Sequence, residues 1–148
     1  MNIGSLELVL GSASGLNVPG TYTFTGVAVS GVTTVWSNPF KLMAATTFGC
    51  AVLCQGNNPQ IQVQLEESFV DLKLGGYTIN GSSIYYVVPD AFPDIFSQIS
   101  DNNWHIPAEP VTPIPMYHGR FKVNGLSGNG SGVTVAIVLF RQEPGRFL

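Results

Sequence analysis

Hydrophobic and polar residues alternate along several short stretches of the chain, which is the pattern of β-strands with one buried face. Gln60–Leu65 has strict period two, with its isoleucine, valine and leucine on one face and its three glutamines on the other. Thr21–Thr25 alternates in the same way and predicts a strand with Tyr22 and Phe24 directed inward. Further strands are expected over Ile3–Leu10, Val32–Trp36, Phe48–Gln55 and Ser83–Val88.

The most complete pattern is Tyr117–Gln142, where two strand-like runs flank a turn rich in glycine, asparagine and serine. In the first run, Phe121 and Val123 share one face. The second run, Val133–Phe140, is apolar apart from one threonine, which is typical of a strand buried on both faces. We therefore expect a closing hairpin, with the rest of the chain arranged around it.

One segment, Asp90–Ser100, is predicted as a short helix, because Asp90 can cap it and apolar residues recur at helical spacing. Pro93 must then lie in its first turn. The remaining pattern is a series of short strands separated by Gly, Pro and Asn turns. The expected fold class is all-β, a jelly-roll-like two-sheet β-sandwich with one short helix, and residues 1–148 have the length of a single domain.

Charge is scarce and unevenly placed. Charged residues make up 10% of the chain, against about 25% in an average soluble protein. Residues 1–65 contain only Glu7 and Lys41. Interface cores are depleted in charge, so the pattern fits a large contact surface, and it fits equally a well-buried first sheet with Ser/Thr outer faces.

The same composition argues against two classes of partner. The net charge is −3 and there is no basic cluster, so nucleic acid is not an expected partner. No apolar run reaches the ~20 residues of a membrane-spanning helix, and no signal peptide opens the chain, so no membrane partner is expected.

No pattern of the Ser-His-Asp, HExxH, P-loop or GxGxxG type is present. Cys50 and Cys54 would have Cα atoms about 13 Å apart in a strand, too far for a disulfide. We expect free, buried thiols and a reducing compartment. A zinc site would need His105 or His118 in addition, and both histidines are expected at the surface or at an interface rather than as acid–base groups.

The adjacent carboxylates Glu66 and Glu67 point to opposite faces of a strand, so they are poorly placed to act as a catalytic pair. We interpret them as solvated loop charges. The prediction is a protein that is not an enzyme and has no metal or other cofactor.

Aromatic residues leave one alternative open. Trp36 and Trp104, together with three tyrosines at positions 77, 85 and 86, are candidates for a platform on which sugars stack. The favoured interpretation places these aromatic residues in the core or at subunit contacts. Ligand stacking by Trp36 and Trp104 stays as the alternative.

Two C-terminal stretches resemble small β-sandwich proteins of tailed-phage structural modules. Ser100–Pro107, which reads SDNNWHIP, is similar to their S-x-D-G-x-N-W-x-x-I turn, with Asn102 in place of the glycine. Gly119–Gly125 followed by Gly132–Arg141 resembles their usual ending, a Y-x-R-V-x-V-x-G strand, a Gly/Ser turn and V-T-V-x-L-V-x-R. Many proteins of this family are jelly-roll decoration or cement proteins that bind the capsid lattice as oligomers.

The resemblance implies a virion structural protein that decorates or cements a bacteriophage capsid shell. It would be made in the cytoplasm of the host bacterium and would bind the major capsid protein and copies of itself, as a trimer or a dimer. Relative to the family, Glu66–Ile99 is an insertion that carries the predicted helix and either projects or packs over one end of the sandwich. The alternative function is a carbohydrate- or host-binding β-sandwich module of a phage tail or fibre.

Two segments are expected to supply subunit contacts. Met1–Asn38, in which only Glu7 is charged, is expected to contribute most of the surface that meets neighbouring subunits or the capsid. Within it, Met1–Leu10 is either an arm that adds a strand to a neighbour's sheet or an edge strand of its own sandwich. The apolar residues of the insertion exceed what a solvated loop needs. The candidate interface residues are Ile3, Leu6, Leu8, Leu10, Phe92 and Phe96.

Overall fold

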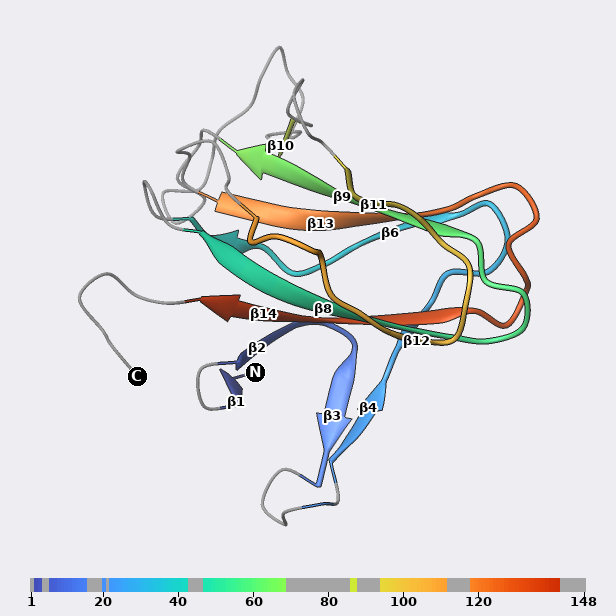
Figure 1. The fold of residues 1–148 in the computed structure, drawn as a ribbon, viewed down its shortest axis with the longest axis horizontal. Coiled ribbons are helices and arrows are strands. Elements are labelled where there is room, and N and C mark those ends of the chain that lie inside the picture. The colour runs from blue at the N-terminus through green and yellow to red at the C-terminus, as the bar shows by residue number, and fades with distance from the viewer. Residues whose placement is uncertain are drawn as a thin grey trace, which may run out of the picture.

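The computed structural model describes residues 2–3, 6–15, 20, 22–42, 47–68, 86–87, 94–111 and 118–141. Its strands form two six-stranded sheets and a separate two-stranded hairpin, and all strand pairs are antiparallel. The two large sheets lie one over the other (Figure 1), and the described residues contain no helix. The all-β prediction is confirmed.

The first large sheet is built around the last strand and is called the β14 sheet. It has the order β1 (Asn2–Ile3), β2 (Leu6–Leu10), β14 (Thr134–Arg141), β8 (Phe48–Gln55), β12 (Asn103–His105), with β5 (Val27–Ala28) also on β14.

The second large sheet is called the β13 sheet. It has the order β10 (Tyr86–Val87), β9 (Ile61–Ser68), β13 (His118–Gly125), β6 (Thr34–Trp36), with β11 (Asp94–Ile99) on β9 and β7 (Phe40–Lys41) on β13.

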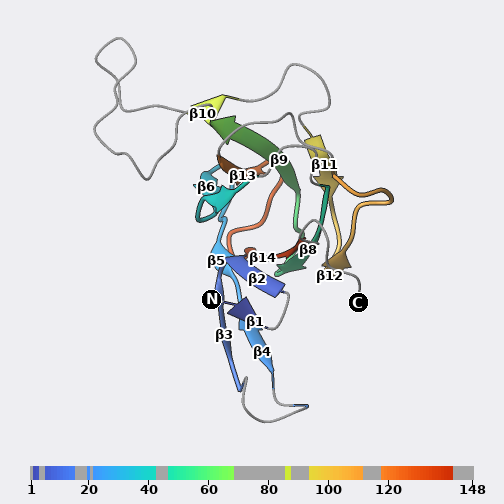
Figure 2. The same ribbon diagram turned by 90° about the vertical axis from the view of Figure 1, so that its left-hand side faces the viewer.

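The remaining hairpin consists of β3 (Ser12–Ser14) and β4 (Thr23–Thr25). It extends away from the β14 sheet on the side opposite the β13 sheet (Figures 1 and 2).

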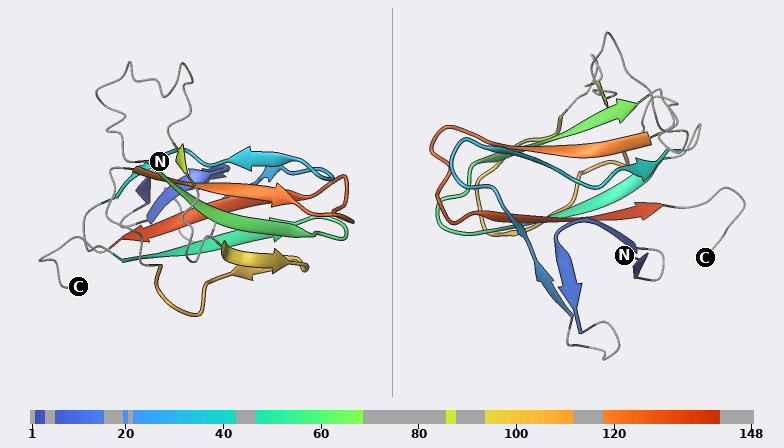
Figure 3. Two further views of the ribbon diagram at one scale, coloured as in Figure 1. Left: turned by 90° about the horizontal axis from the view of Figure 1, so that it is seen from above. Right: turned by 180° about the vertical axis from the view of Figure 1, so that it is seen from behind.

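The chain follows the path of one long hairpin folded over on itself. The outgoing strands β2, β6, β8 and β9 pair with the returning strands β14, β13, β12 and β11 respectively. Two further ladders, β13 with β9 and β14 with β8, have eight residue pairs each and join these units into sheets. Strands far apart in the sequence therefore lie side by side (Figure 3).

The predicted closing hairpin is wrong in one respect, because β13 and β14 do not pair with each other. Each belongs to a different sheet, and the segment between them crosses from one sheet to the other. Turn residues show where the chain reverses, but they do not distinguish a hairpin from a connection between sheets. The prediction of a doubly buried last strand is confirmed for Val135 through Leu139, which are at most 3% exposed.

The core lies between the two sheets. It takes one face of each strand, so Phe121 and Val123 do share an inward face and are both fully buried. The ring of Phe40 lies 5.7 Å from that of Phe48 and 5.1 Å from that of Phe121. Aliphatic residues that face each other across the core include Val9, Leu10, Val52, Ile61, Val63, Val135, Ile137 and Leu139.

The buried Asn129 side chain connects three loops at one end of the molecule. Its Nδ2 donates to the carbonyl oxygens of Val29 and Gly31, at 2.6 and 2.9 Å. Its Oδ1 accepts from the main-chain N–H of Gln60 at 2.8 Å. A buried amide with all these partners fixes the crossing between the sheets.

The segment predicted as a helix forms a strand where the structure describes it. Asp94–Ile99 is β11, which pairs with the edge of β9 and changes register twice along its length. The irregular register allows both Ile95 and Phe96 to pack against the core, a spacing that also fits a helix. The edge of β9 supplies main-chain partners, whereas a helix this short gains little stability alone. Residues 90–93 lie outside the described residues.

Both ends of the expected insertion, Glu66–Ile99, belong to the β13 sheet. Residues 66–68 complete β9, and residues 94–99 form the neighbouring β11. The first and last parts of the segment are therefore strands of the sheet. The two alternatives for its middle part, projection or packing over one end of the sandwich, fall largely outside the described residues.

The N-terminal segment lies in the chain's own sheet. β2 pairs with β14, and β1 folds back on β2 at the edge. The described part of Met1–Leu10 is therefore an edge strand of its own sheet and not an arm donated to a neighbour.

The strand predicted over Thr21–Thr25 forms as β4, but it lies in the projecting hairpin. Tyr22 is 46% exposed and Phe24 is only half-buried. The prediction that both side chains enter the core is wrong, because alternation identifies a two-faced strand without showing what covers either face.

Candidate binding surfaces

One candidate surface is the outer face of the β13 sheet. Strand geometry turns alternate side chains of β6, β13, β9 and β11 away from the core. We call this surface the polar face, and it consists of Thr34 and Trp36 on β6, Arg120, Lys122 and Asn124 on β13, Gln62, Gln64 and Glu66 on β9, and Asp94 on β11. Cross-strand register aligns these side chains in rows across the sheet.

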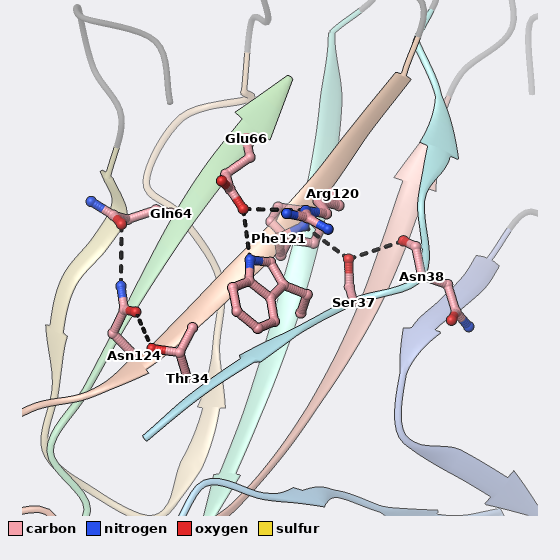
Figure 4. A network of polar contacts seen from close by, with 9 residues as sticks. Thr34, Ser37, Asn38, Gln64, Glu66, Arg120, Phe121 and Asn124 are labelled. Atoms are coloured by element: carbon pink, nitrogen blue, oxygen red, sulfur yellow. Dashed lines mark hydrogen bonds and ion pairs between the residues drawn. The ribbon is translucent and has the colours of Figure 1, made fainter. Parts of the chain in front are cut away.

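Trp36 is held in one orientation by its neighbours although it is 46% exposed. Its Nε1 donates a hydrogen bond to Oε1 of Glu66 at 2.8 Å. Nε of Arg120 donates to the same oxygen at 3.2 Å, and its Cζ lies over the indole ring, 5.2 Å from the centroid. Glu66 is 7% exposed, so these charge-assisted contacts are shielded from water (Figure 4).

Amide side chains form a second hydrogen-bonded group beside Trp36. Thr34 donates to Oδ1 of Asn124 at 2.9 Å. Nδ2 of Asn124 donates to Oε1 of Gln64 at 3.1 Å (Figure 4). The same Nδ2 lies 3.1 Å from Oε1 of Gln62, and Gln64 donates to Asp94 at 2.9 Å. This network holds the amide groups in fixed orientations.

The charges of the polar face balance. Arg120 and Lys122 are positive, and Glu66 and Asp94 are negative. The surface therefore offers closely spaced donors and acceptors without a net charge that would attract an ion.

The second candidate surface is the outer face of the β14 sheet, which we call the apolar face. Its outward-pointing residues are Ala51 and Leu53 on β8, Trp104 on β12, and Ala136, Val138 and Phe140 on β14. Ala51, Ala136 and Val138 are buried within the chain, so the open part of this face is formed by Trp104, Phe140 and the half-buried Leu53. Trp104 is 38% exposed and Phe140 is 41% exposed. None of these six residues is charged.

The β3–β4 hairpin rises from this apolar face. The ring of Phe24 meets that of Trp104 edge-on, with centroids 5.3 Å apart. A Cβ on Gly11 would lie 2.6 Å from the carbonyl oxygen of Thr25 and 3.1 Å from Cβ of Ala136, so glycine is needed where the hairpin meets the sheet. Gly11 also has a φ of +96°, which favours glycine.

The candidate interface residues do not form one surface. Leu8 and Leu10 are only 5% and 6% exposed, because the chain's own packing covers them. Phe96 packs against the core and lies 6.1 Å from the ring of His105. Leu8 and Leu10 therefore offer little surface to another subunit, whereas Phe96 is half-buried, and the interface role of these residues stays a prediction. The Ile3 and Leu6 side chains, and Phe92, lie outside what the structure describes.

The two cysteines are free and buried, as predicted. Burial raises the pKa of the Cys50 thiol to about 12. Burial, and secondarily the charge of Asp101, raises the pKa of the Cys54 thiol to about 11. Both are therefore protonated at neutral pH, where the thiolate, the reactive form of cysteine, is disfavoured.

The histidines are not brought together. His105 lies in β12 and Asp101 in the turn before it. Nε2 of His105 is 2.8 Å from a carboxylate oxygen of Asp101. His118 is only 9% exposed, so the expectation of a surface position is wrong for it. Within the described ranges, no three His, Cys, Asp or Glu residues form a group that could hold a metal ion.

The two tryptophans proposed for ligand stacking lie on opposite sides of the molecule. Trp36 belongs to the polar face and Trp104 to the apolar face, so a single platform containing both is excluded. Tyr77 and Tyr85 lie outside the described residues.

Sequence reasoning also missed Glu66 and Arg120 as partners of Trp36. Glu66 and Glu67 do point to opposite faces, but they are buried strand residues rather than solvated loop charges. A period-two extension of Gln60–Leu65 would have placed Glu66 beside the glutamines. The contact with Trp36 depends on strand order, which that period does not reveal.

Comparison with models of protein families finds no match for this chain, and comparison with curated proteins finds none either. Among the residues that the structure describes, no helix has the length and apolar character needed to cross a membrane.

Proposed function

We propose that this chain is a structural virion protein that decorates or cements a bacteriophage capsid shell through its apolar face. The observation that carries the proposal is the exposure of Trp104 and Phe140 on a sheet face without charge. Residues 8–40, which supply the adjoining hairpin, also contain no charged residue. Large aromatic side chains in a charge-free surrounding are characteristic of the cores of protein interfaces.

The projecting hairpin supports the same proposal. A two-stranded hairpin is marginally stable in water unless another element packs against it. Its root is held by the Phe24–Trp104 contact and by the close approach of Gly11 to β14. Tyr22 beyond that root is 46% exposed. A protein bound in the angle between the hairpin and the sheet would cover all these aromatic side chains together.

Strand order supports assignment to the jelly-roll class of β-sandwich. Counting only the eight strands that form the folded-over hairpin, the first lies beside the last, and the second beside the seventh. The third lies beside the sixth and the fourth beside the fifth, as expected for two Greek keys in opposing sheets. Viral capsid domains are among the proteins built this way.

The partners proposed are the major capsid protein and further copies of the chain, as a trimer or a dimer. The protein would be synthesised in the cytoplasm of the host bacterium, consistent with two free thiols. It would act without catalysis, by contact alone.

The test compares the wild-type protein with a Phe140→Lys variant. Sedimentation would measure self-association, and co-sedimentation with shells assembled without this protein would measure capsid binding. We expect the charge on the apolar face to weaken both, because it must be desolvated in the contact.

Val32→Lys is the matched control, since Val32 is 75% exposed and belongs to neither face. It should leave both measurements unchanged. A wild-type protein that stays monomeric and does not bind shells would overturn the proposal, as would a Phe140→Lys variant that behaves like wild type.

A further inference from the structure

We infer that the polar face of the β13 sheet is a binding site for a neutral glycan, with Trp36 as the surface on which a sugar ring stacks. This inference is independent of the capsid proposal, because it concerns the opposite side of the molecule and a different class of ligand. It rests on the juxtaposition of one fixed, half-exposed indole with a row of oriented amides.

The indole is prepared for stacking before any ligand arrives. Oε1 of Glu66 accepts a hydrogen bond from Nε1 of Trp36 at 2.8 Å, and the guanidinium of Arg120 lies over the indole ring. With those contacts made, 46% of the Trp36 side chain is still exposed. A sugar ring presents apolar C–H groups on its faces, and it would stack on the face of the indole that Arg120 does not cover. An immobilised aromatic ring receives such a ligand at little entropic cost.

The amides beside Trp36 match the rest of a sugar. Each hydroxyl both donates and accepts, and amide side chains provide both functions within one group. Across the sheet from Trp36 lie Lys122 and then Gln64, while Asn124 and Gln62 occupy the adjacent row. Four strands at about 4.8 Å spacing make this surface about 14 Å wide, enough for a short oligosaccharide.

The charge balance selects among polar ligands. Two cationic and two anionic side chains cancel, so the face has no net charge that would favour a phosphate or a carboxylate. Among its described side chains, the face also lacks the cluster of large apolar residues found at the core of a protein interface. A hydroxyl-rich, uncharged ligand satisfies these donors and acceptors without leaving an ion unpaired.

The direct test uses the fluorescence of Trp36 itself. The chain has two tryptophans, so a Trp104→Phe variant carries Trp36 as its only one. The probe is a panel of neutral oligosaccharides of glucose, galactose, mannose and N-acetylhexosamines, screened first on an array and then titrated in solution. We expect a saturable change in emission for the bound oligosaccharide, and no change in the Trp36→Phe protein.

Affinity measurements then locate the site. Trp36→Ala should weaken binding roughly tenfold or more, the equivalent of a stacking contact worth about 1.4 kcal/mol. Trp104→Ala is the matched control and should bind like wild type, because Trp104 lies on the apolar face. Glu66 is a positioning residue, so Glu66→Ala should weaken binding and Glu66→Gln should restore part of it by keeping an acceptor for the indole N–H.

Three results would overturn the inference. These are the absence of binding to every neutral oligosaccharide on the array, binding that survives Trp36→Ala, and binding that is lost in Trp104→Ala alone. Because the fluorescence titration needs no substitution at position 36, the test stands even if Trp36→Ala fails to fold.

Discussion

The two outer faces of this molecule are built by the same alternation of side chains, yet they differ in nearly every chemical property. The polar face holds Trp36 by a hydrogen bond and a stacked guanidinium, whereas the apolar face leaves Phe140 41% exposed beside small residues. One face has balanced charges and the other has none. A sandwich of two sheets can therefore present two surfaces suited to different classes of partner.

The difference is also one of preorganisation. Side chains of the polar face are linked to each other, so a ligand would meet a rigid surface and lose little entropy in ordering it. On the apolar face the projecting hairpin and Trp104 touch each other edge-on and remain partly exposed. A partner protein would complete that arrangement by burying it.

The largest effect on stability should come from neither face but from the link between the sheets. Asn129→Ala removes three hydrogen bonds at a site that is 9% exposed. Because the carbonyls of Val29 and Gly31 then lose a buried donor, we expect a loss of about 2–4 kcal/mol in the free energy of unfolding. Urea denaturation measures it.

Asn103→Ala is the matched control for that substitution. Asn103 is exposed, and its Oδ1 accepts one hydrogen bond from the N–H of Trp104 at 2.8 Å. Asn103→Ala should lower the free energy of unfolding by less than about 1 kcal/mol. Equal losses of unfolding free energy in Asn129→Ala and Asn103→Ala would show that the buried hydrogen bonds of Asn129 stabilise the fold no more than an exposed one.

On the polar face, Glu66→Ala should lower the free energy of unfolding by about 1–3 kcal/mol. The substitution removes a carboxylate, 7% exposed, that accepts hydrogen bonds from Trp36 Nε1 and from Nε of Arg120. Asp94→Ala, on the same face but at an exposed position, should change stability by less than about 0.5 kcal/mol. Thermal unfolding monitored by circular dichroism compares the two, and a harmless Glu66→Ala would contradict a preorganised face.

The thiols on the inner side of β8 give a test by pH. Their pKa values are raised by burial to about 12 for Cys50 and about 11 for Cys54, while unfolded thiols ionise near about 8.5. The folded state therefore retains protons that the unfolded state loses. Their stabilising contribution is complete below about pH 8.5 and declines as the pH rises toward 11.

The measurement for the thiols is the urea midpoint between pH 8 and 11. A Cys50→Ala, Cys54→Ala double variant should show a shallower decline than wild type, since other groups that ionise in this range are common to both. If the urea midpoints of wild type and the double variant fall in parallel with pH, the two buried thiols contribute nothing to the pH dependence of stability.

The smallest effect on folding is expected for the apolar face. Phe140→Ala should change the free energy of unfolding by about 1 kcal/mol or less, because the side chain is 41% exposed. Its effect should instead appear as weaker self-association at high concentration, measured by light scattering. If the substitution unfolds the protein but leaves association intact, Phe140 belongs to the fold and not to a contact surface.

Much of the fold follows from local patterns in the sequence. The alternation of Gln60–Leu65 correctly placed its apolar residues inward, and the apolar run ending near Phe140 correctly predicted a central strand. Free, buried cysteines followed from their spacing within β8. These features depend on residues within one strand, which is why one sequence was enough to predict them.

Tertiary structure decided the features that depend on which strands are neighbours. The edge of β9 turned the expected helix into β11, and the crossing held by Asn129 placed β13 and β14 in different sheets. The same strand order set Trp36 beside Glu66 and separated it from Trp104 by the thickness of the molecule. Side-chain alternation states which residues share a face, but only the pairing of distant strands determines what that face contains.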